Sequence, residues 1–146
     1  MKVRDLMTSD PATVGPDDVV SQAATLMREE DCGSLPVVKD ATLVGIVTDR
    51  DIAVRSVAAG ADPKRQHVSE IMSADPITIA PDSDADEAAR MMAEFQVRRL
   101  PVVEDGHLLG IVVTAQLARR ESAGTMGSTI KEISEPASGR ASHARG

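Results

Sequence analysis

The chain has 146 residues, of which 42% are hydrophobic, and its formal net charge is −7. This length allows one ordinary domain or two very small ones, with enough apolar residues to fill a core. Non-specific binding to a phosphate backbone needs a basic face, and stacking on single-stranded bases needs aromatic rings. Because the net charge is negative and Phe95 is the single aromatic residue, the composition argues against nucleic acid as a partner.

Cysteine content and hydropathy set further limits. Cys32 is the single cysteine, so the chain forms no internal disulfide. No run of residues approaches the length of a membrane span or of a signal-peptide core. We therefore expect a cytoplasmic protein with no membrane partner.

The chain contains an internal repeat. Residues 3–53 align with residues 68–118 at a constant offset of 65 without gaps, and 21 of the 51 aligned pairs are identical. The run Leu-Pro-Val-Val at residues 35–38 recurs at 100–103, and Gly-Ile-Val at 45–47 recurs at 110–112. Self-similarity of this kind indicates one supersecondary unit that is built twice.

Each repeat predicts the element order βαββα. In the first repeat we expect short strands around residues 13–14, 35–38 and 43–47, because these runs are apolar and β-branched. A helix is predicted between the first two strands, where Val20, Ala23 and Met27 recur at helical spacing. A second helix is predicted from Asp49 to Ala59, and its counterpart in the second repeat covers residues 115–121.

These elements predict an α+β fold of two repeats packed with pseudo-two-fold symmetry. We place the first domain at residues 1–63, the second at 64–121 and a flexible C-terminal tail at 122–146, with one helical turn at 130–133. A unit of about 55 residues is near the lower limit for independent stability. The two repeats are therefore expected to share one core.

The segment that joins a predicted strand to the helix at Asp49 has the strongest functional pattern. Thr48 and Asp51 fall at i and i+3 in the first helical turn, so their side chains lie on one side. Thr-x-x-Asp is a capping-box pattern, in which the two side chains satisfy backbone N–H groups. The same hydroxyl and carboxylate could instead hold an anion and a neighbouring diol. Both interpretations remain open at the level of the motif.

The doubled pattern resembles the CBS domain and its paired form, the Bateman module, over residues 3–120. The motifs that carry the resemblance are the Val-Arg-Asp-Leu-Met-Thr opening at residues 3–8, the two Leu-Pro-Val-Val strands and the Gly-Ile-Val-Thr-Asp-Arg-Asp-Ile segment at 45–52. The last of these, with Ala58-Ala59-Gly60 after it, is similar to the small stand-alone CBS pairs of actinobacteria of the hypoxic-response type.

The resemblance implies binding of an adenosyl ligand such as AMP, ATP or S-adenosylmethionine in the cleft between the repeats. By that resemblance, Thr48 holds phosphate, Asp51 holds the ribose hydroxyls and backbone groups near Thr13 read the adenine edge. Arg98 and Arg99 contact phosphate from the other repeat. The full set of implied ligand-binding residues is Thr13, Val14, Leu35, Pro36, Val37, Thr48, Asp49, Arg50, Asp51, Arg98 and Arg99.

The second repeat departs from this pattern. At the offset of 65, Thr48 becomes Val113 and Asp51 becomes Gln116, although Thr114 could still cap the helix one residue later. The second repeat has Arg98-Arg99 where the first repeat has Gly33-Ser34. The two arginines could contact phosphate, or they could equally be solvated residues at a strand edge. The sequence thus indicates one competent site rather than two.

Other chemistry finds little support in the sequence. Asp49-Arg50-Asp51 has the form of a metal-binding Asp-x-Asp, but no third ligand is fixed nearby, so we expect no metal. No P-loop or nucleophile-and-base signature is present, so we expect no enzyme and no obligatory cofactor. We expect a regulatory, ligand-sensing homodimer. The alternative is a structural or protein-interaction module without a ligand.

Overall fold

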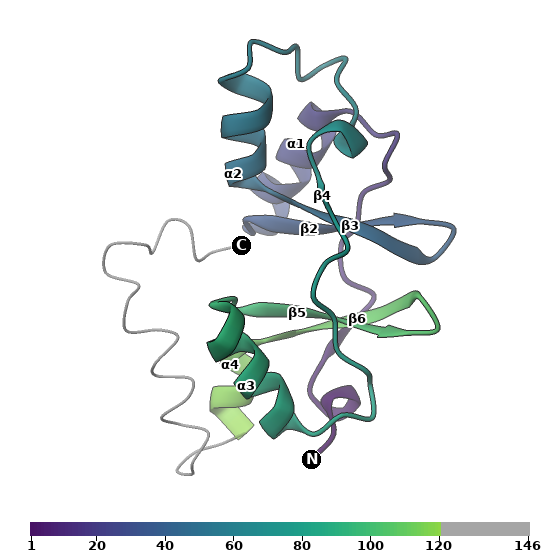
Figure 1. Cartoon of the computed structure of the whole chain (residues 1–146), viewed down its shortest axis with the longest axis vertical. Helices are drawn as coiled ribbons and strands as arrows, with labels where there is room; N and C mark the ends of the chain where they lie inside the picture. Colours follow the sequence, from purple (N-terminus) through teal and green to yellow (C-terminus); the bar gives the residue numbers. More distant parts are fainter. Residues whose placement is uncertain (121–146) are drawn as a thin grey trace. The chain divides into compact units, whose positions relative to one another are not determined.

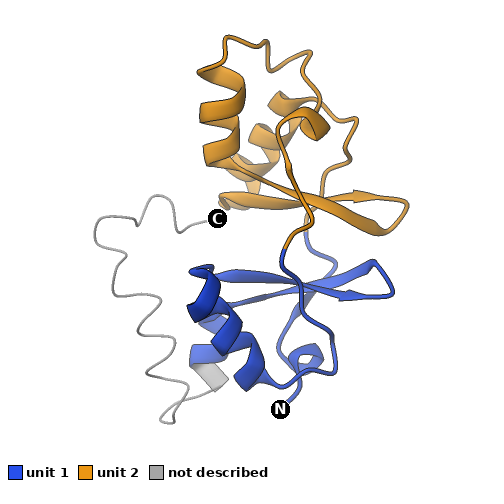
Figure 2. Ribbon diagram, in the orientation of Figure 1, with its two compact units in different colours: residues 1–11, 77–144 blue, residues 12–76, 145–146 orange. Residues whose placement is uncertain are grey.

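A computed structural model describes residues 1–120, which form two compact units (Figure 2). Unit 2 comprises Ala12–Pro76, and unit 1 comprises Met1–Pro11 together with residues 77–120. The opening segment of each sequence repeat therefore belongs to the unit that is built mainly from the other repeat. The predicted tail, with its helical turn at residues 130–133, lies outside the described residues.

Unit 2 is a three-stranded antiparallel sheet with helices (Figure 1). Its central strand β3 (Thr42–Thr48) pairs with β2 (Ser34–Lys39) and with β4 (Ser73–Ala74). Helix α1 (Val20–Glu30) precedes β2, and a 3-10 turn at Val68–Glu70 precedes β4. Helix α2 (Asp49–Asp51) follows β3 and continues as π-helical turns over Ile52–Val57.

Unit 1 repeats this topology. Its central strand β6 (His107–Val113) pairs with β5 (Arg99–Glu104) and with β1 (Thr8–Ser9), again antiparallel. A 3-10 turn at Val3–Asp5 precedes β1, helix α3 (Ala85–Phe95) precedes β5, and helix α4 (Thr114–Arg120) follows β6. The predicted α+β class and its repetition are thus confirmed.

The predicted elements of the first repeat differ from the structure in the following ways. The strand expected around residues 13–14 is reduced to a single parallel bridge between Val14 and Val37. The helix expected from Asp49 to Ala59 begins at Asp49, but its helical residues end at Val57. Its later part is π-helical, with the N–H of Ala58 donating to the carbonyl of Ala53 at 2.9 Å.

The single core expected for the two repeats is wrong, because the described residues form one hydrophobic cluster in each unit. The cluster of unit 1 joins Val3 to Leu100 and Val112, and the cluster of unit 2 joins Val68 and Ile71 to the first repeat. Each small unit is completed by a segment from the other repeat. Burying that segment supplies the apolar surface that a repeat lacks by itself.

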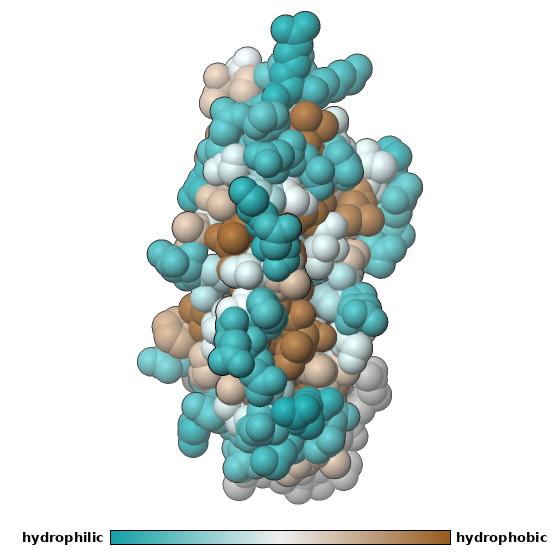
Figure 3. Space-filling view, turned by 90° about the vertical axis from the view of Figure 1, so that its right-hand side faces the viewer, coloured by the Kyte–Doolittle hydropathy of each residue, from teal (hydrophilic) through white to brown (hydrophobic). Residues whose placement is uncertain are grey.

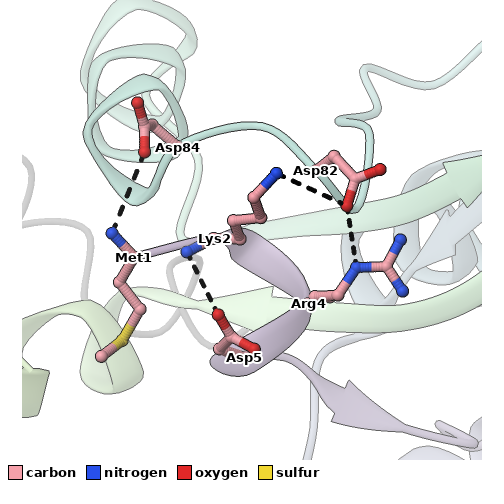
Figure 4. Close-up of polar contacts among 6 residues, drawn as sticks. All are labelled: Met1, Lys2, Arg4, Asp5, Asp82 and Asp84. Carbon is pink, nitrogen blue, oxygen red and sulfur yellow. Dashed lines mark hydrogen bonds and ion pairs between the residues drawn. The ribbon is translucent and has the colours of Figure 1, made fainter.

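The N-terminal segment is held to the rest of unit 1 by backbone hydrogen bonds and by ion pairs, and Figure 4 shows the ion pairs of Met1, Lys2 and Arg4 with Asp82 and Asp84. The N–H of Val3 donates to the carbonyl of Ser83 and the N–H of Arg4 to that of Pro81, both at 2.9 Å. The guanidinium of Arg4 also contacts the carboxylate of Asp82 at 2.9 Å. This hydrogen bond lowers the pKa of Asp82. The small stabilisation from such an exposed pair is present above the unfolded-state pKa of an aspartate and is lost as pH falls through the lowered value.

The two β-hairpins use the same two-residue turn with different residues. Asp40 and Ala41 have φ values of 52° and 67°, and their counterparts Asp105 and Gly106 have 53° and 81°. Positive φ at both central residues is the geometry of a type I′ turn, which matches the twist of the flanking strands. A side chain at the second position is unfavourable there, because an alanine is strained at positive φ.

Replacing Ala41 by glycine is therefore expected to stabilise the protein by about 0.5–1 kcal/mol, because it relieves the strain of a left-handed alanine. Guanidinium denaturation of Ala41→Gly would measure the gain. The matched variant Gly106→Ala should lose a similar amount. Equal stability of the parent and both variants would contradict the turn geometry.

The surface outside the two clusters is mostly hydrophilic on the face shown in Figure 3, with hydrophobic residues in smaller patches. Among the described side chains, the large exposed hydrophobic ones are Met1, Val54, Val57, Ile77 and Phe95. Over residues 1–120, no helix combines the length and the apolar character that crossing a membrane requires. The homodimer expected from the sequence stays a prediction.

Candidate functional site

The candidate site lies where β3 ends and α2 begins, in unit 2. Thr48 is the last residue of β3, and it is paired in register with Ser34 at the start of β2. The same unit also contains Thr13 and Val14, since Val14 forms a bridge to Val37 of β2. The structure thus brings the implied ligand-binding residues of the first repeat into one unit.

Thr48 and Asp51 form the capping box that their spacing predicts. The hydroxyl oxygen of Thr48 accepts a hydrogen bond from the N–H of Asp51 at 3.0 Å, and Oδ2 of Asp51 accepts one from the N–H of Thr48 at 3.0 Å. The hydroxyl uses an acceptor site in this bond and keeps its own proton for donation. Capping therefore leaves one donor at Thr48 and the second carboxylate oxygen at Asp51.

The second carboxylate oxygen of Asp51 faces an arginine that the sequence analysis missed. Asp51 is buried, with 9% of its surface exposed, and its Oδ1 lies 3.7 Å from Nε of Arg55. Nη1 of Arg55 donates to the carbonyl oxygen of Ile71 at 3.0 Å. The spacing of Asp51 and Arg55, four residues apart on a helix, is a sequence signal that could have revealed this pair.

The backbone beside β2 offers polar groups at Thr13. The N–H of Val14 donates to the carbonyl of Pro36 at 3.1 Å, and the carbonyl of Val14 accepts from the N–H of Val38 at 2.8 Å. Thr13 is exposed, and within the described part of the chain its own N–H and C=O groups have no hydrogen-bond partner. An edge of a planar base could be read there.

The aliphatic residues that we expected to hold adenine have a packing role. Val14, Leu35 and Val37 are 4%, 1% and 0% exposed, and all three belong to the hydrophobic cluster of unit 2. Pro36, which lies between Leu35 and Val37 on β2, is buried outside that cluster. Ligand contact by these four residues stays a prediction.

The charged residues of the implied site lie in both units. Asp49 and Arg50 are exposed at the start of α2, where the N–H of Asp49 donates to the carbonyl of Gly33 at 2.9 Å. Arg98 and Arg99 are half-buried in unit 1, at the start of β5. Their contribution to a ligand site stays a prediction.

The equivalent helix start in unit 1 has different chemistry. Oε1 of Gln116 accepts from the N–H of Val113 at 2.9 Å, and its Nε2 donates to the hydroxyl of Thr8 at 2.8 Å. Gln116 thus replaces Asp51 in the cap and also binds the N-terminal segment. Thr114, which the sequence offers as a cap for this helix, is its first residue, and its hydroxyl donates to the carbonyl of Arg98 at 3.2 Å; its capping role stays a prediction.

The described residues contain no group of three or more His, Cys, Asp or Glu side chains that could hold a metal ion. Within residues 1–120, the carboxylates of Asp49 and Asp51 therefore have no further ligand to complete an Asp-x-Asp site.

Comparison with known proteins places this geometry in a family. The CBS domain model matches residues 3–57 and 68–122. Hypoxic response protein 1 of Mycobacterium tuberculosis is 35% identical over 134 residues, which are 91% of this chain and 94% of that protein. The crystal structure of hypoxic response protein I with two coordinated zinc ions has a TM-score of 0.75 and 37% identity, covering 82% of this chain and 98% of that one.

Two further structures contain adenosyl ligands. CBSX2 of Arabidopsis thaliana in complex with AMP has a TM-score of 0.72 and 30% identity, covering 83% of this chain and 96% of that one. The CBS domain pair of MJ0100, in complex with 5′-methylthioadenosine and S-adenosyl-L-methionine, has a TM-score of 0.70 and 29% identity, covering 84% and 96%. The matches to both repeats show that this chain belongs to the CBS domain family and carries two CBS domains in tandem.

Proposed function

We propose that this protein is a non-catalytic regulatory module that binds an adenosyl nucleotide at Thr48 and Asp51. The observation that carries the proposal is the capping box of unit 2, which keeps a hydroxyl donor and a carboxylate oxygen beyond its own two hydrogen bonds. Relatives in the family have been crystallised with AMP and with S-adenosyl-L-methionine.

Each group of the ligand has a suitable partner in unit 2. A carboxylate only accepts hydrogen bonds, so Asp51 suits the two O–H groups of a ribose. The free proton of the Thr48 hydroxyl suits a phosphate oxygen or another acceptor. The N–H and C=O of Thr13, which have no hydrogen-bond partner among residues 1–120, suit the polar edge of adenine. A ligand that favours one conformation of the module would shift its population and so regulate a partner.

Titration calorimetry with AMP, ATP and S-adenosylmethionine tests the proposal. We expect heat with a stoichiometry of one ligand per chain for at least one of the three. The chain has no Trp and no Tyr, so adenine carried over from expression would dominate the ultraviolet spectrum of the purified protein. If none of the three gives heat or a thermal shift, the alternative of a structural or protein-interaction module takes the place of the proposal.

We propose that Arg98 and Arg99 contact the phosphate of the ligand. A chain with a net charge of −7 repels an anionic ligand unless cations lie near the phosphate. Within residues 1–120, neither guanidinium is paired with a carboxylate. Both remain available for charge-assisted hydrogen bonds.

The variant Arg99→Ala is expected to weaken AMP binding by about tenfold, the size of one hydrogen bond to a charged group, and to leave adenosine binding unchanged. Calorimetry with both ligands measures the difference. Arg90→Ala, which removes an exposed arginine from α3 of the same unit, is the matched control. Equal losses for AMP and adenosine would rule out a phosphate contact by Arg99.

A further inference from the structure

Arg55 connects the candidate site to the segment that leads from unit 2 into unit 1. Its Nε faces Oδ1 of Asp51 at 3.7 Å, while its Nη1 donates to the carbonyl oxygen of Ile71 at 3.0 Å. Ile71 is fully buried in the cluster of unit 2 and directly precedes Met72 and strand β4. The guanidinium of Arg55 therefore links the carboxylate of Asp51 to the backbone of Ile71, at the start of the segment 71–76.

Comparison of the two units shows what Arg55 does in unit 2. In unit 1 the amide of Gln116 both accepts from Val113 and donates directly to Thr8 of the opening segment. In unit 2 the equivalent residue is Asp51, and an ionised carboxylate has no proton to donate. The connection to residues 71–76 therefore needs a hydrogen-bond donor outside the cap, and the guanidinium of Arg55 supplies one.

We propose that Arg55 is a positioning residue of the nucleotide site and that it couples occupancy of the site to the segment 71–76. The inference rests on the proposed binding of a ribose by Asp51. Arg55 holds Oδ1 of the carboxylate in place, so the ribose hydroxyls meet a fixed acceptor. A ligand that engages Asp51 in turn holds Arg55 against Ile71, because coupling between two sites is reciprocal.

This role predicts how the loss of Arg55 changes the affinities for ligands with and without a phosphate. Positioning acts through Asp51 on the ribose, so Arg55→Ala should weaken AMP and adenosine by the same factor, between about threefold and tenfold. An arginine that touched phosphate directly would instead weaken AMP more than adenosine. Arg65→Ala serves as the control for charge, because Arg65 is exposed in the same unit and pairs only with Asp62 among the described residues.

The coupling is tested by hydrogen–deuterium exchange of the peptide N–H groups of Ser73 and Ala74. AMP, ATP and S-adenosylmethionine are compared first, and the ligand that binds the wild-type protein most tightly is used. It should slow this exchange in the wild-type protein. Arg55→Ala should abolish the nucleotide-dependent change. Arg55→Lys keeps the charge beside Asp51 but lacks the planar fork, so it should recover most of the affinity without the change in exchange.

The outcomes separate this inference from the proposed function. Absence of any binding by the wild-type protein defeats the proposed function, and the inference with it. If Arg55→Ala changes the affinities for AMP and adenosine by less than twofold, or weakens AMP binding alone, the positioning role is wrong and the proposed function stands. A nucleotide-dependent slowing at Ser73 and Ala74 that persists in Arg55→Ala overturns the coupling. Circular dichroism of each variant confirms that it is folded before the comparison is made.

Discussion

Asp51→Ala is expected to lower the affinity for AMP by between about tenfold and a hundredfold. The substitution removes the acceptor of both ribose hydroxyls, and hydrogen bonds to a charged group contribute about 1.5–3 kcal/mol. The N–H of Thr48 also loses its acceptor, Oδ2 of Asp51, which lies 3.0 Å away. Titration calorimetry with AMP on the parent and on the variant measures the loss.

The matched control comes from the other repeat. Gln116 makes the same bond to the residue at the strand end, with Val113 at 2.9 Å, and also contacts Thr8. Gln116→Ala is expected to cost about 1 kcal/mol of stability through the lost cap while leaving AMP affinity unchanged. If both variants lose stability alike and neither changes AMP binding, Asp51 is a capping residue and nothing more.

A second variant separates charge from capping at Asp51 itself. Asp51→Asn keeps an acceptor for the N–H of Thr48, as the amide of Gln116 shows for the equivalent position. It removes the negative charge that makes the carboxylate a strong acceptor for two hydroxyls. We expect Asp51→Asn to retain most of the stability and to lose most of the affinity.

Sequence reasoning was able to predict the repeated elements because their signals are local. Runs such as Leu-Pro-Val-Val are β-branched and bounded by turn residues, and Thr48 and Asp51 carry the helix-start pattern in four residues. Both features are confirmed as β2 and β5 and as a capping box. Nothing beyond a short window of sequence was needed for these elements.

The exchange of opening segments had no such signal. Val3 corresponds to Val68, Met7 to Met72 and Gly45 to Gly110, so each opening segment matches the sheet of either repeat equally well. The sequence identity that reveals the repeat therefore gives no indication of which opening segment pairs with which sheet. The buried roles of Val14, Leu35 and Val37 could not be distinguished from contact with a ligand, because core packing and contact with adenine both need aliphatic side chains.

The last expectation concerns Gly110, at the centre of β6. Register places it opposite Ser9, and a Cβ added there would lie 2.5 Å from the carbonyl oxygen of Thr8 and 2.8 Å from Sδ of Met7. A backbone oxygen cannot rotate away, so β1 has to shift. Overpacking of this kind costs about 1–3 kcal/mol, and urea denaturation of Gly110→Ala should show that loss. Gly15→Ala, whose Cβ meets nothing closer than 3.5 Å, should stay within about 0.5 kcal/mol of the parent.

The location of the damage tests the exchange of segments. Gly45 is the equivalent position in β3, where an added Cβ would lie 2.8 Å from the carbonyl oxygen of Ser73 in β4. Gly110→Ala should therefore speed hydrogen exchange and proteolysis in Met1–Pro11, and Gly45→Ala should do so in residues 68–76. If each opening segment paired with the sheet of its own repeat, the two results would be reversed. That reversal would also separate Arg55 from the carbonyl of Ile71, because the segment that carries Ile71 would then belong to the other unit.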